Sequence, residues 1–334
     1  MIMLSFPKPK LRLGYVPTRR DMFLHPMYKE IKANVDDRMR ELAEAYDFTL
    51  ITTQALSFPE KTFRMGSRIM NVPAGDLMTD YADAKLISEY FRAEHIDALF
   101  VPFCNFGQEE AVARLAKDLN VPLLVWAPRD PAPIGLEPRQ TDSQCGIFAA
   151  TKVLQRYGVT FTYIENCRLE DPVFERDFAR FLSTAQIVKA FRNARIAQIS
   201  VRPQQFLSVM VNEAELLEKF GVELVPITGT QLVNTIQAIL ESDSGEIDEL
   251  VEDIEKTLDM SRLKDKRVIA AIELGLMQIA RDYGCSAIAC DCWHTIRNAF
   301  GVAPCFIFGD LNDRGLPCAC ELDIHAAIAS LMAV

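Results

Sequence analysis

The strongest constraint in this sequence is the alternation of short, continuous apolar runs with longer stretches whose apolar residues recur at helical spacing. A run that is apolar throughout is typical of a strand buried on both faces, as strands are in a parallel sheet. The runs that predict strands are residues 11–17, 48–53, 97–103, 121–127, 159–165, 194–201, 222–228, 286–292 and 303–309. Right-handed crossovers through the intervening helices then give an α/β fold of the doubly wound kind.

The alternation is interrupted at NCRLEDPVFERDF, where Asp171 and Pro172 are expected to start a long connecting helix. We therefore predict two doubly wound parallel-sheet (Rossmann-like) domains in series, residues 1–168 and residues 169–334. Residues 231–283 are expected to be helical throughout, with the acidic run ESDSGEIDELVEDIEK as a solvated face.

Charge and composition exclude several classes of function. The net charge is −10, and the Lys and Arg residues are scattered, which argues against a nucleic-acid partner. No apolar run approaches the roughly 18–20 residues of a membrane span. The nine cysteines lack the regular spacing of a secreted disulfide framework and the N-terminus lacks a signal-peptide pattern, so we expect a cytoplasmic protein. Without a Gly-x-Gly-x-x-Gly after a strand or a Walker A motif, a nucleotide cofactor is unsupported.

Doubly wound sheets bind ligands beyond the carboxyl ends of their strands, so the residues after each apolar run are the informative ones. In the first predicted domain these segments are PTRRD, CNFGQEE and PRD, and in the second they are RPQQF, CDCWH and GDLNDRGLPCACELD. They are rich in Arg, Gln, Asp and Glu, as a polar substrate requires.

Two interpretations of the cysteines remain open. Cys104 in CNFGQEE is compatible with the thiolate of a cofactor-independent racemase, which needs a second cysteine such as Cys290 or Cys292, but a small buried apolar residue is the favoured interpretation. The CDC and CAC (Cys318–Cys320) segments with His294 suggest a structural zinc site. Cys-x-Cys on one strand is awkward for zinc, however, and the strand period of two places Cys290 and Cys292 on one face, where they line the core.

Two carboxylates, Glu321 and Asp323, follow Pro317 and precede the last apolar helical pattern. Carboxylates are stabilised at a helix N-terminus, so their spacing alone is explained by capping. His25 and His95 are expected to be turn or surface residues.

Across residues 11–334 the sequence resembles the L-fucose isomerase and L-arabinose isomerase superfamily, and it is more similar to the fucose side. The resemblance rests on the order and spacing of five segments. They are LGYVPTRRDMF, DALFVPFCNFGQEEAVARLAKDLNVPLLVWAPRD, RIAQISVRPQQFLSVM, YGCSAIACDCWHTIRNAFG and APCFIFGDLNDRGLPCACELDIHAAIASLMA.

This resemblance implies an enzyme that interconverts an aldose and a ketose through a cis-enediol, with a divalent metal, usually Mn²⁺, held by a Glu, an Asp and a His. Glu321 aligns with the glutamate that is both metal ligand and catalytic base in the family, and Asp323 matches a supporting acid. The resemblance also implies that neighbouring subunits complete the sugar pocket of a homo-oligomer, as a trimer or hexamer. Positions that face substrate or a neighbouring subunit fall on Arg19, Arg20, Gln108, Glu109 and Trp293.

The main departure from the family pattern concerns the other two metal ligands. In the family they follow later in the chain, the histidine in a third, β-rich domain that is absent here, and neither His294 nor His325 occupies its position. The last helical pattern ends without a stop signal, so we expect an incomplete chain. The alternatives are a shortened relative that borrows ligands from another chain, or a non-catalytic sugar-binding or assembly protein.

Overall fold

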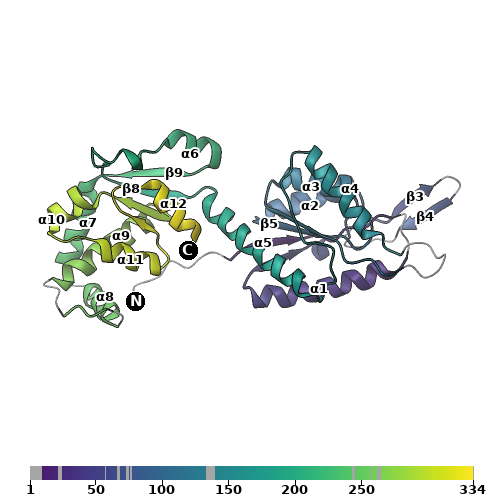
Figure 1. The fold of residues 1–334 in the computed structure, drawn as a ribbon, viewed down its shortest axis with the longest axis horizontal. Helices are drawn as coiled ribbons and strands as arrows, with labels where there is room; N and C mark the ends of the chain where they lie inside the picture. Colours follow the sequence, from purple (N-terminus) through teal and green to yellow (C-terminus); the bar gives the residue numbers. More distant parts are fainter. Residues whose placement is uncertain are drawn as a thin grey trace. The chain divides into compact units, whose positions relative to one another are not determined.

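The structure, a computed structural model, describes residues 10–21, 25–56, 58–65, 68–72, 75, 77–132, 140–242, 245–256, 258–261 and 265–333. The chain divides into two compact units, Lys10–Gln186 and Ile187–Val334 (Figure 1). Each unit is an α/β layer structure built on a parallel sheet, as the sequence predicts.

The sheet of the Lys10–Gln186 unit has five parallel strands in the order β2-β1-β5-β6-β7. They are β1 (Arg12–Tyr15), β2 (Thr49–Thr52), β5 (Ala98–Pro102), β6 (Leu123–Trp126) and β7 (Thr162–Tyr163). A separate antiparallel hairpin, β3 (Lys61–Met65) and β4 (Arg68–Val72), pairs only with itself among the described residues. Without the hairpin the order is 2-1-3-4-5, a doubly wound order whose direction switches between β1 and β5.

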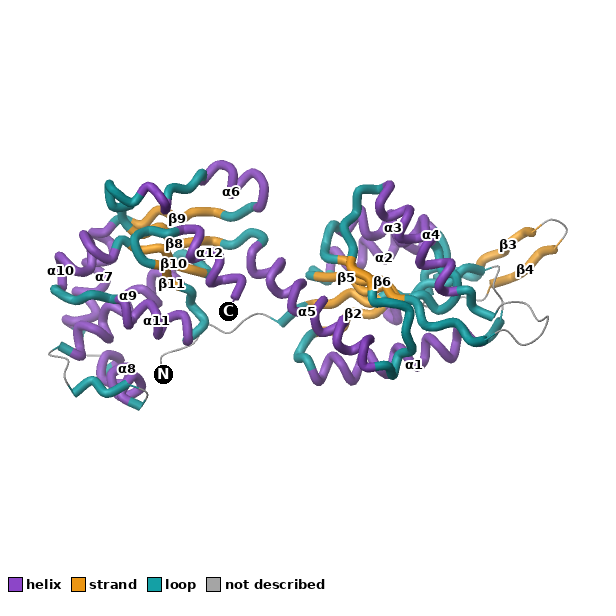
Figure 2. Tube along the Cα trace, viewed as in Figure 1, coloured by secondary structure: helices purple, strands orange, loops and turns teal. Residues whose placement is uncertain are grey.

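Helices cover both faces of this sheet (Figure 2). One face carries α2 (Tyr81–Ala93), α3 (Glu109–Leu119) and α4 (Ser143–Arg156), and the other carries α1 (Met27–Ala45) and α5 (Pro172–Phe191). The contact with α5 is aromatic, because Trp126 of β6 meets Phe174 edge-on, with ring centroids 4.8 Å apart. A short 3₁₀ turn, Thr53–Ala55, follows β2.

The sheet of the Ile187–Val334 unit has four parallel strands in the order β11-β10-β8-β9. They are β8 (Arg195–Ile199), β9 (Glu223–Ile227), β10 (Ala287–Cys290) and β11 (Cys318–Ala319). Counted in chain order this is again 2-1-3-4, and here the switch lies between β8 and β10. The two units therefore repeat one topology.

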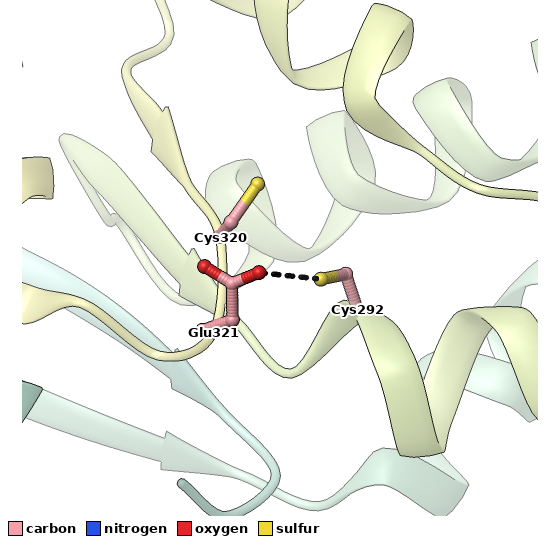
Figure 3. A group of neighbouring side chains, drawn as sticks. All are labelled: Cys292, Cys320 and Glu321. Carbon is pink, nitrogen blue, oxygen red and sulfur yellow. Dashed lines mark hydrogen bonds between the residues drawn. The ribbon is translucent and has the colours of Figure 1, made fainter. Parts of the chain in front are cut away.

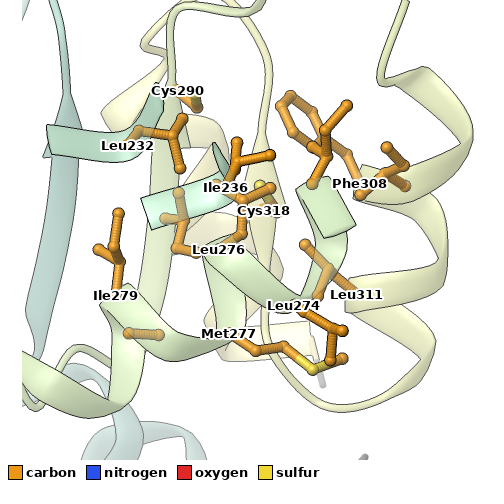
Figure 4. Packing of buried hydrophobic residues seen from close by; sticks show 14 of the residues in the cluster. Leu232, Ile236, Leu274, Leu276, Met277, Ile279, Cys290, Phe308, Leu311 and Cys318 are labelled. Carbon is orange, nitrogen blue, oxygen red and sulfur yellow. The ribbon is translucent and has the colours of Figure 1, made fainter. Parts of the chain in front are cut away.

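The helices of this unit also lie on both faces of the sheet. One face carries α7 (Gly229–Glu241), α8 (Glu246–Glu255), α9 (Lys266–Asp282) and α11 (Cys305–Asp313), and the other carries α6 (Glu213–Phe220) and α12 (Ile324–Ala333). Short helical segments are a 3₁₀ turn at Leu207–Val209, a π-helix at Cys292–Arg297 and α10 (Asn298–Phe300). The first face holds the larger apolar cluster, part of which is shown in Figure 4.

Several sequence predictions differ from the structure. The strand predicted at residues 303–309 is the helix α11, because Ile307, Phe308 and Leu311 share one buried face at helical spacing. The strand predicted at residues 159–165 shrinks to two residues, and β10 ends at Cys290, before Cys292. The stretch predicted to be wholly helical is three helices, α7, α8 and α9.

The division between the units also differs from the predicted boundary at residues 168 and 169. The connecting helix does begin at Pro172, but the two compact units meet between Gln186 and Ile187, inside α5. The aromatic face of α5 belongs to the core of the first unit, which explains why most of this helix is counted with it. Among the described residues, no helix is both long and apolar enough to cross a membrane.

Candidate functional site

The carboxyl edge of the second sheet gathers the residues that follow β10 and β11. The two strands pair in parallel, with Ile288 level with Cys318, so the segments after them leave the sheet at the same edge. Cys292 opens the π-helix just after β10, and Glu321 lies just after β11. This edge is next to the switch between β8 and β10, where doubly wound sheets bind ligands.

Three side chains at this edge, Cys292, Cys320 and Glu321, form a cluster of possible metal ligands (Figure 3). The Cys292 thiol donates toward Oε1 of Glu321 over 4.0 Å, and the ligand atoms of all three residues lie within 4.8 Å of one another. Cys292 is buried, whereas Cys320 and Glu321 are half-buried. The cluster therefore lies between the core and the solvent.

The turn that carries Glu321 has an unusual backbone. Glu321 and Leu322 have φ angles of 53° and 62°, in the left-handed region that residues other than glycine rarely adopt. The N–H of Leu322 donates to the carbonyl of Cys290 at 3.3 Å, and the N–H of Asp323 donates to the carbonyl of Cys320 at 2.9 Å. Such strain persists only where the surroundings fix the backbone, and it concentrates at functional sites.

The two thiols of the cluster differ in acidity. A hydrogen bond with Cys320 lowers the pKa of Cys292 to about 7, although burial opposes this, and the backbone N–H of Glu321 adds to the lowering. The same hydrogen bond with Cys292, with burial, raises the pKa of the Cys320 thiol. Cys292 is therefore the thiol of this pair that ionises first.

Asp323, which the sequence predicts as a supporting acid, lies next to the cluster but serves the helix that follows. Its Oδ1 accepts the N–H of Ala326 at 2.9 Å, in the first turn of α12. This is the capping role that its spacing suggests. His325 is exposed on the same helix and is not part of the cluster.

The π-helix after β10 turns Trp293 and His294 outward. Asp291, which is fully buried, accepts the N–H of His294 at 3.2 Å and the hydroxyl of Thr295 at 3.3 Å, and so caps this helix. Trp293 is 43% exposed and meets the ring of Phe206 edge-on, with centroids 5.5 Å apart. Trp293 is thus partly open to solvent rather than packed in the core.

The other cysteines considered as ligands or nucleophiles lie in the core. Cys290 and Cys318 are buried among the apolar side chains of the larger cluster (Figure 4), and burial raises the pKa of both thiols well above its ordinary value. Cys104 is fully buried and packs with Tyr28 and Leu77. Cys292 belongs to the same apolar cluster and Cys320 packs against it, so what sets these two thiols apart from Cys290 and Cys318 is the Glu321 carboxylate beside them.

In the first unit, Arg19 and Arg20 follow β1 at the switch between β1 and β5. Arg19 is 4% exposed, and its Nη2 lies 3.5 Å from Oδ1 of Asp21, with the guanidinium over the ring of Tyr28. Within the described part of the chain, Nε of Arg19 and Oδ1 of Asp21 have no hydrogen-bond partner. Burial raises the pKa of Asp21, although the charge of Arg19 opposes this.

Arg20 is held by the loop that follows β5. Its N–H donates to Oδ1 of Asn105 at 2.7 Å, its Nε donates to the carbonyl of Gly107 at 3.0 Å, and its guanidinium stacks on Phe106. Burial lowers the pKa of Arg20. No role was predicted for Asn105 itself, although its place after a central strand, in the segment CNFGQEE, was a usable signal.

Gln108 and Glu109 mark the start of α3 at the same edge of the first sheet. Gln108 is the N-cap residue, and its N–H donates to the hydroxyl of Thr18 at 3.3 Å. Glu109 lies in the first turn, where a carboxylate favours the helix dipole. The structure thus places Arg19, Arg20, Gln108 and Glu109 at one switch point, and Glu321 and Trp293 at the other.

Comparisons with known proteins give a family for the first unit. Residues 14–192 match the sequence profile of the family described as "Fucose/sulfoquinovose isomerase, N-terminal domain". The chain is 22% identical over 232 residues to a sulfoquinovose isomerase from Clostridium sp. (strain MSTE9), covering 69% of this chain and 52% of that protein. It is 23% identical over 256 residues to a sulfoquinovose isomerase from Priestia megaterium, covering 76% and 56%. The chain thus spans about half the length of the curated relatives it matches.

Among solved structures, the chain is similar to a solute-binding protein of an ABC transporter from Burkholderia multivorans. That match covers 97% of this chain and 93% of the other at 12% identity, with a TM-score of 0.24. A score this low supports no argument about fold or function.

Proposed function

The chain belongs to the fucose/sulfoquinovose isomerase family, and from this premise we propose that it is part of a sugar isomerase that interconverts an aldose and a ketose. The observation that carries the proposal is the place of Glu321. It is a half-buried carboxylate on a strained turn, at the edge of the sheet next to the switch between β8 and β10. Doubly wound sheets bind ligands at this place.

The proposed chemistry is a proton transfer by the Glu321 carboxylate. The carboxylate removes the proton from the hydroxyl-bearing carbon next to the sugar carbonyl, and the electron pair of that C–H bond forms the carbon–carbon double bond of an enediolate whose charge lies on the former carbonyl oxygen. The proton of the neighbouring hydroxyl moves to this oxygen, and the carboxyl group returns its proton to the former carbonyl carbon, so the aldose becomes a ketose with no net change in atoms or electrons. A carboxylate positioned in this way contributes roughly 10²–10⁴-fold to the rate.

The manganese ion expected from the family does not fit the donors that surround Glu321. Carboxylate and water oxygens suit Mn²⁺, whereas thiols suit softer ions, and two of the three clustered donors are the thiols of Cys292 and Cys320. A manganese site would need further oxygen or nitrogen ligands from outside this cluster. The proton transfer proposed here therefore uses Glu321 alone.

We propose further that Arg19 and Arg20 bind oxygen groups of the sugar substrate, with Gln108, Glu109 and Trp293 in lesser roles. The support is that Arg19 is buried at a switch point with an Nε that lacks a partner among the described residues. Replacing Arg20 by methionine should raise KM and leave kcat nearly unchanged, because the group binds rather than reacts. Arg114, exposed on α3 and paired with Glu110, provides the matched control.

The test is ketose formation from a panel of neutral, 6-deoxy and sulfonated aldoses, using protein expressed from its complete reading frame. Glu321→Gln should reduce kcat about 100-fold or more, whereas Asp323→Asn should retain activity, because Asp323 caps α12. In deuterated water the product should carry solvent deuterium at the carbon that receives the proton only to the extent that the carboxyl proton exchanges with solvent before its return. An active Glu321→Gln variant contradicts the proposal.

The same assay separates the alternatives. Sugar binding without turnover by the folded protein would indicate a non-catalytic sugar-binding relative. We also propose assembly as a trimer or hexamer, and light scattering on the purified protein tests this directly.

A further inference from the structure

The cluster of Cys292, Cys320 and Glu321 has a composition that the proposed isomerase chemistry does not use. Proton transfer needs the carboxylate but neither thiol. The two thiols nevertheless come from different segments, one after β10 and the other after β11, and both lie beside the same carboxylate. Two sulfur atoms and one carboxylate oxygen placed this closely are possible ligands of a metal ion.

We propose that Cys292, Cys320 and Glu321 form a binding site for a thiophilic divalent cation, of which Zn²⁺ is the example. Thiolate sulfur and carboxylate oxygen are both ordinary zinc ligands, and three protein ligands leave the fourth position for water or another oxygen ligand. The inference concerns the metal class and the two thiol ligands, and it does not depend on the isomerase proposal.

The geometry is close to what such an ion requires. Ligands at about 2.3 Å (sulfur) and about 2.1 Å (oxygen) from one tetrahedral ion lie about 3.6 Å apart. The Cys292 sulfur and the Glu321 oxygen are 4.0 Å apart, and no pair in the cluster exceeds 4.8 Å. Small side-chain rotations therefore suffice to close the site around an ion.

The Glu321 carboxylate distinguishes these two thiols from Cys290 and Cys318. Cys290, Cys292 and Cys318 all belong to the larger apolar cluster and Cys320 packs against it, but among the described residues only Cys292 and Cys320 are grouped with a carboxylate as possible metal ligands. Cys320 and Glu321 are half-buried, so they face both the interior and the solvent. The backbone bonds that fix the turn at Leu322 hold the carboxylate beside Cys292 before any ion arrives. Figure 3 shows the carboxylate directed toward the Cys292 sulfur.

A cation bound here would share Glu321 with the proposed catalytic step. Zinc coordination would occupy the carboxylate that moves the proton, so Zn²⁺ is expected to inhibit turnover while Mn²⁺ competes poorly for the two thiols. Each thiol loses its proton on binding, so one ion should release up to two protons.

The test uses Co²⁺ as a spectroscopic probe with the reduced, full-length protein. Binding should give thiolate-to-cobalt charge-transfer absorption in the near ultraviolet and a stoichiometry of one ion, both abolished by added Zn²⁺. Cys292→Ser and Cys320→Ser should each lose most of this absorption, and Glu321→Gln should retain it with weaker binding. Cys145→Ser, an exposed cysteine of the other unit, should behave as the unchanged protein.

A second measurement avoids any variant that fails to fold. In the unchanged protein, Zn²⁺ should protect Cys292 and Cys320 from alkylation by iodoacetamide, as peptide mass spectrometry would show. Cobalt binding without thiolate absorption, or alkylation of both thiols that Zn²⁺ does not slow, overturns the proposal. Metal binding in a protein without isomerase activity would uphold this inference and refute the proposed function, so the two fail separately.

Discussion

Replacing Arg314 by methionine is expected to destabilise the Ile187–Val334 unit. Arg314 follows α11 and bonds to three acidic side chains. Its Nε donates to Oε1 of Glu273 at 2.9 Å and to Oδ2 of Asp310 at 2.6 Å, and its Nη1 donates to Oδ2 of Asp253 at 2.8 Å. The Arg314 side chain is 12% exposed and that of Glu273 is 0% exposed, so the loss leaves buried carboxyl groups without their cation.

The expected magnitude follows from the burial of each partner. Removing one member of a buried pair costs about 3–5 kcal/mol, whereas exposed pairs contribute under about 1 kcal/mol. Burial raises the pKa of Glu273 to about 9, so this side chain is protonated at neutral pH. Removing Arg314 therefore costs less at Glu273 than it would if Glu273 were charged. We therefore expect Arg314→Met to lower the free energy of unfolding by about 3 kcal/mol at pH 7, the lower end of that range. The stability of Arg314→Lys should lie between that of the unchanged protein and that of Arg314→Met, because an ammonium group keeps the charge but lacks the guanidinium fork.

Each unit contains one of the two tryptophans, Trp126 in the first and Trp293 in the second, so tryptophan fluorescence can report the unfolding of one unit at a time. In a Trp126→Phe background, the fluorescence of Trp293 reports unfolding of the Ile187–Val334 unit in urea at pH 7. The control is Arg267→Ala, which removes an exposed ion pair with Asp248 on the same unit. If Arg314→Met loses no more stability than Arg267→Ala, the buried network contributes little and the reasoning is refuted.

Three further predictions test local features. Gly146→Ala should destabilise the protein by roughly 1–3 kcal/mol, because an added Cβ would lie 1.8 Å from the carbonyl oxygen of Phe106. Gly309→Ala in α11, where an added Cβ meets open space, should instead stabilise the protein by about 0.5–1 kcal/mol. Thermal unfolding of the two variants and the unchanged protein measures both effects. Glu273 keeps its proton in the folded state up to a pKa of about 9 but loses it near pH 4.5 when unfolded. Stability from this group is therefore full at low pH and declines as pH rises toward 9, and Glu273→Gln should flatten the dependence of the urea midpoint between pH 5 and 9. Asp323→Ala should cost about 1 kcal/mol by removing the acceptor for the first turn of α12, and Asp323→Asn should restore most of it.

The central strands were predictable because a strand buried on both faces must be apolar throughout. The two-residue strand β11 was not, since Cys318 and Ala319 are too few to show any period. The apolar run at residues 303–309 was wrongly predicted as a strand for a related reason, because the run alone is too short to show a helical period. The period becomes visible only when Leu311, beyond the run, is considered with Ile307 and Phe308.

The site was predictable only in part. Spacing alone could not separate a capping role from a functional one for Glu321, and the family resemblance selected it. Cys292 and Cys320 are far apart in the sequence, and their proximity depends on β10 and β11 being neighbours. Cys292 was instead predicted to lie on the strand with Cys290, but β10 ends at Cys290 and Cys292 is the first residue of the π-helix at the sheet edge.

The strand order of the second sheet has a consequence for synthesis of the protein. β11 is the last of the four strands to leave the ribosome, and it covers the outer side of β10. Until residue 319 has emerged, the wholly apolar β10, Ala287–Cys290, is an open edge able to pair with another chain. A chain released after α11 but before β11 would thus keep this edge open and be prone to aggregate.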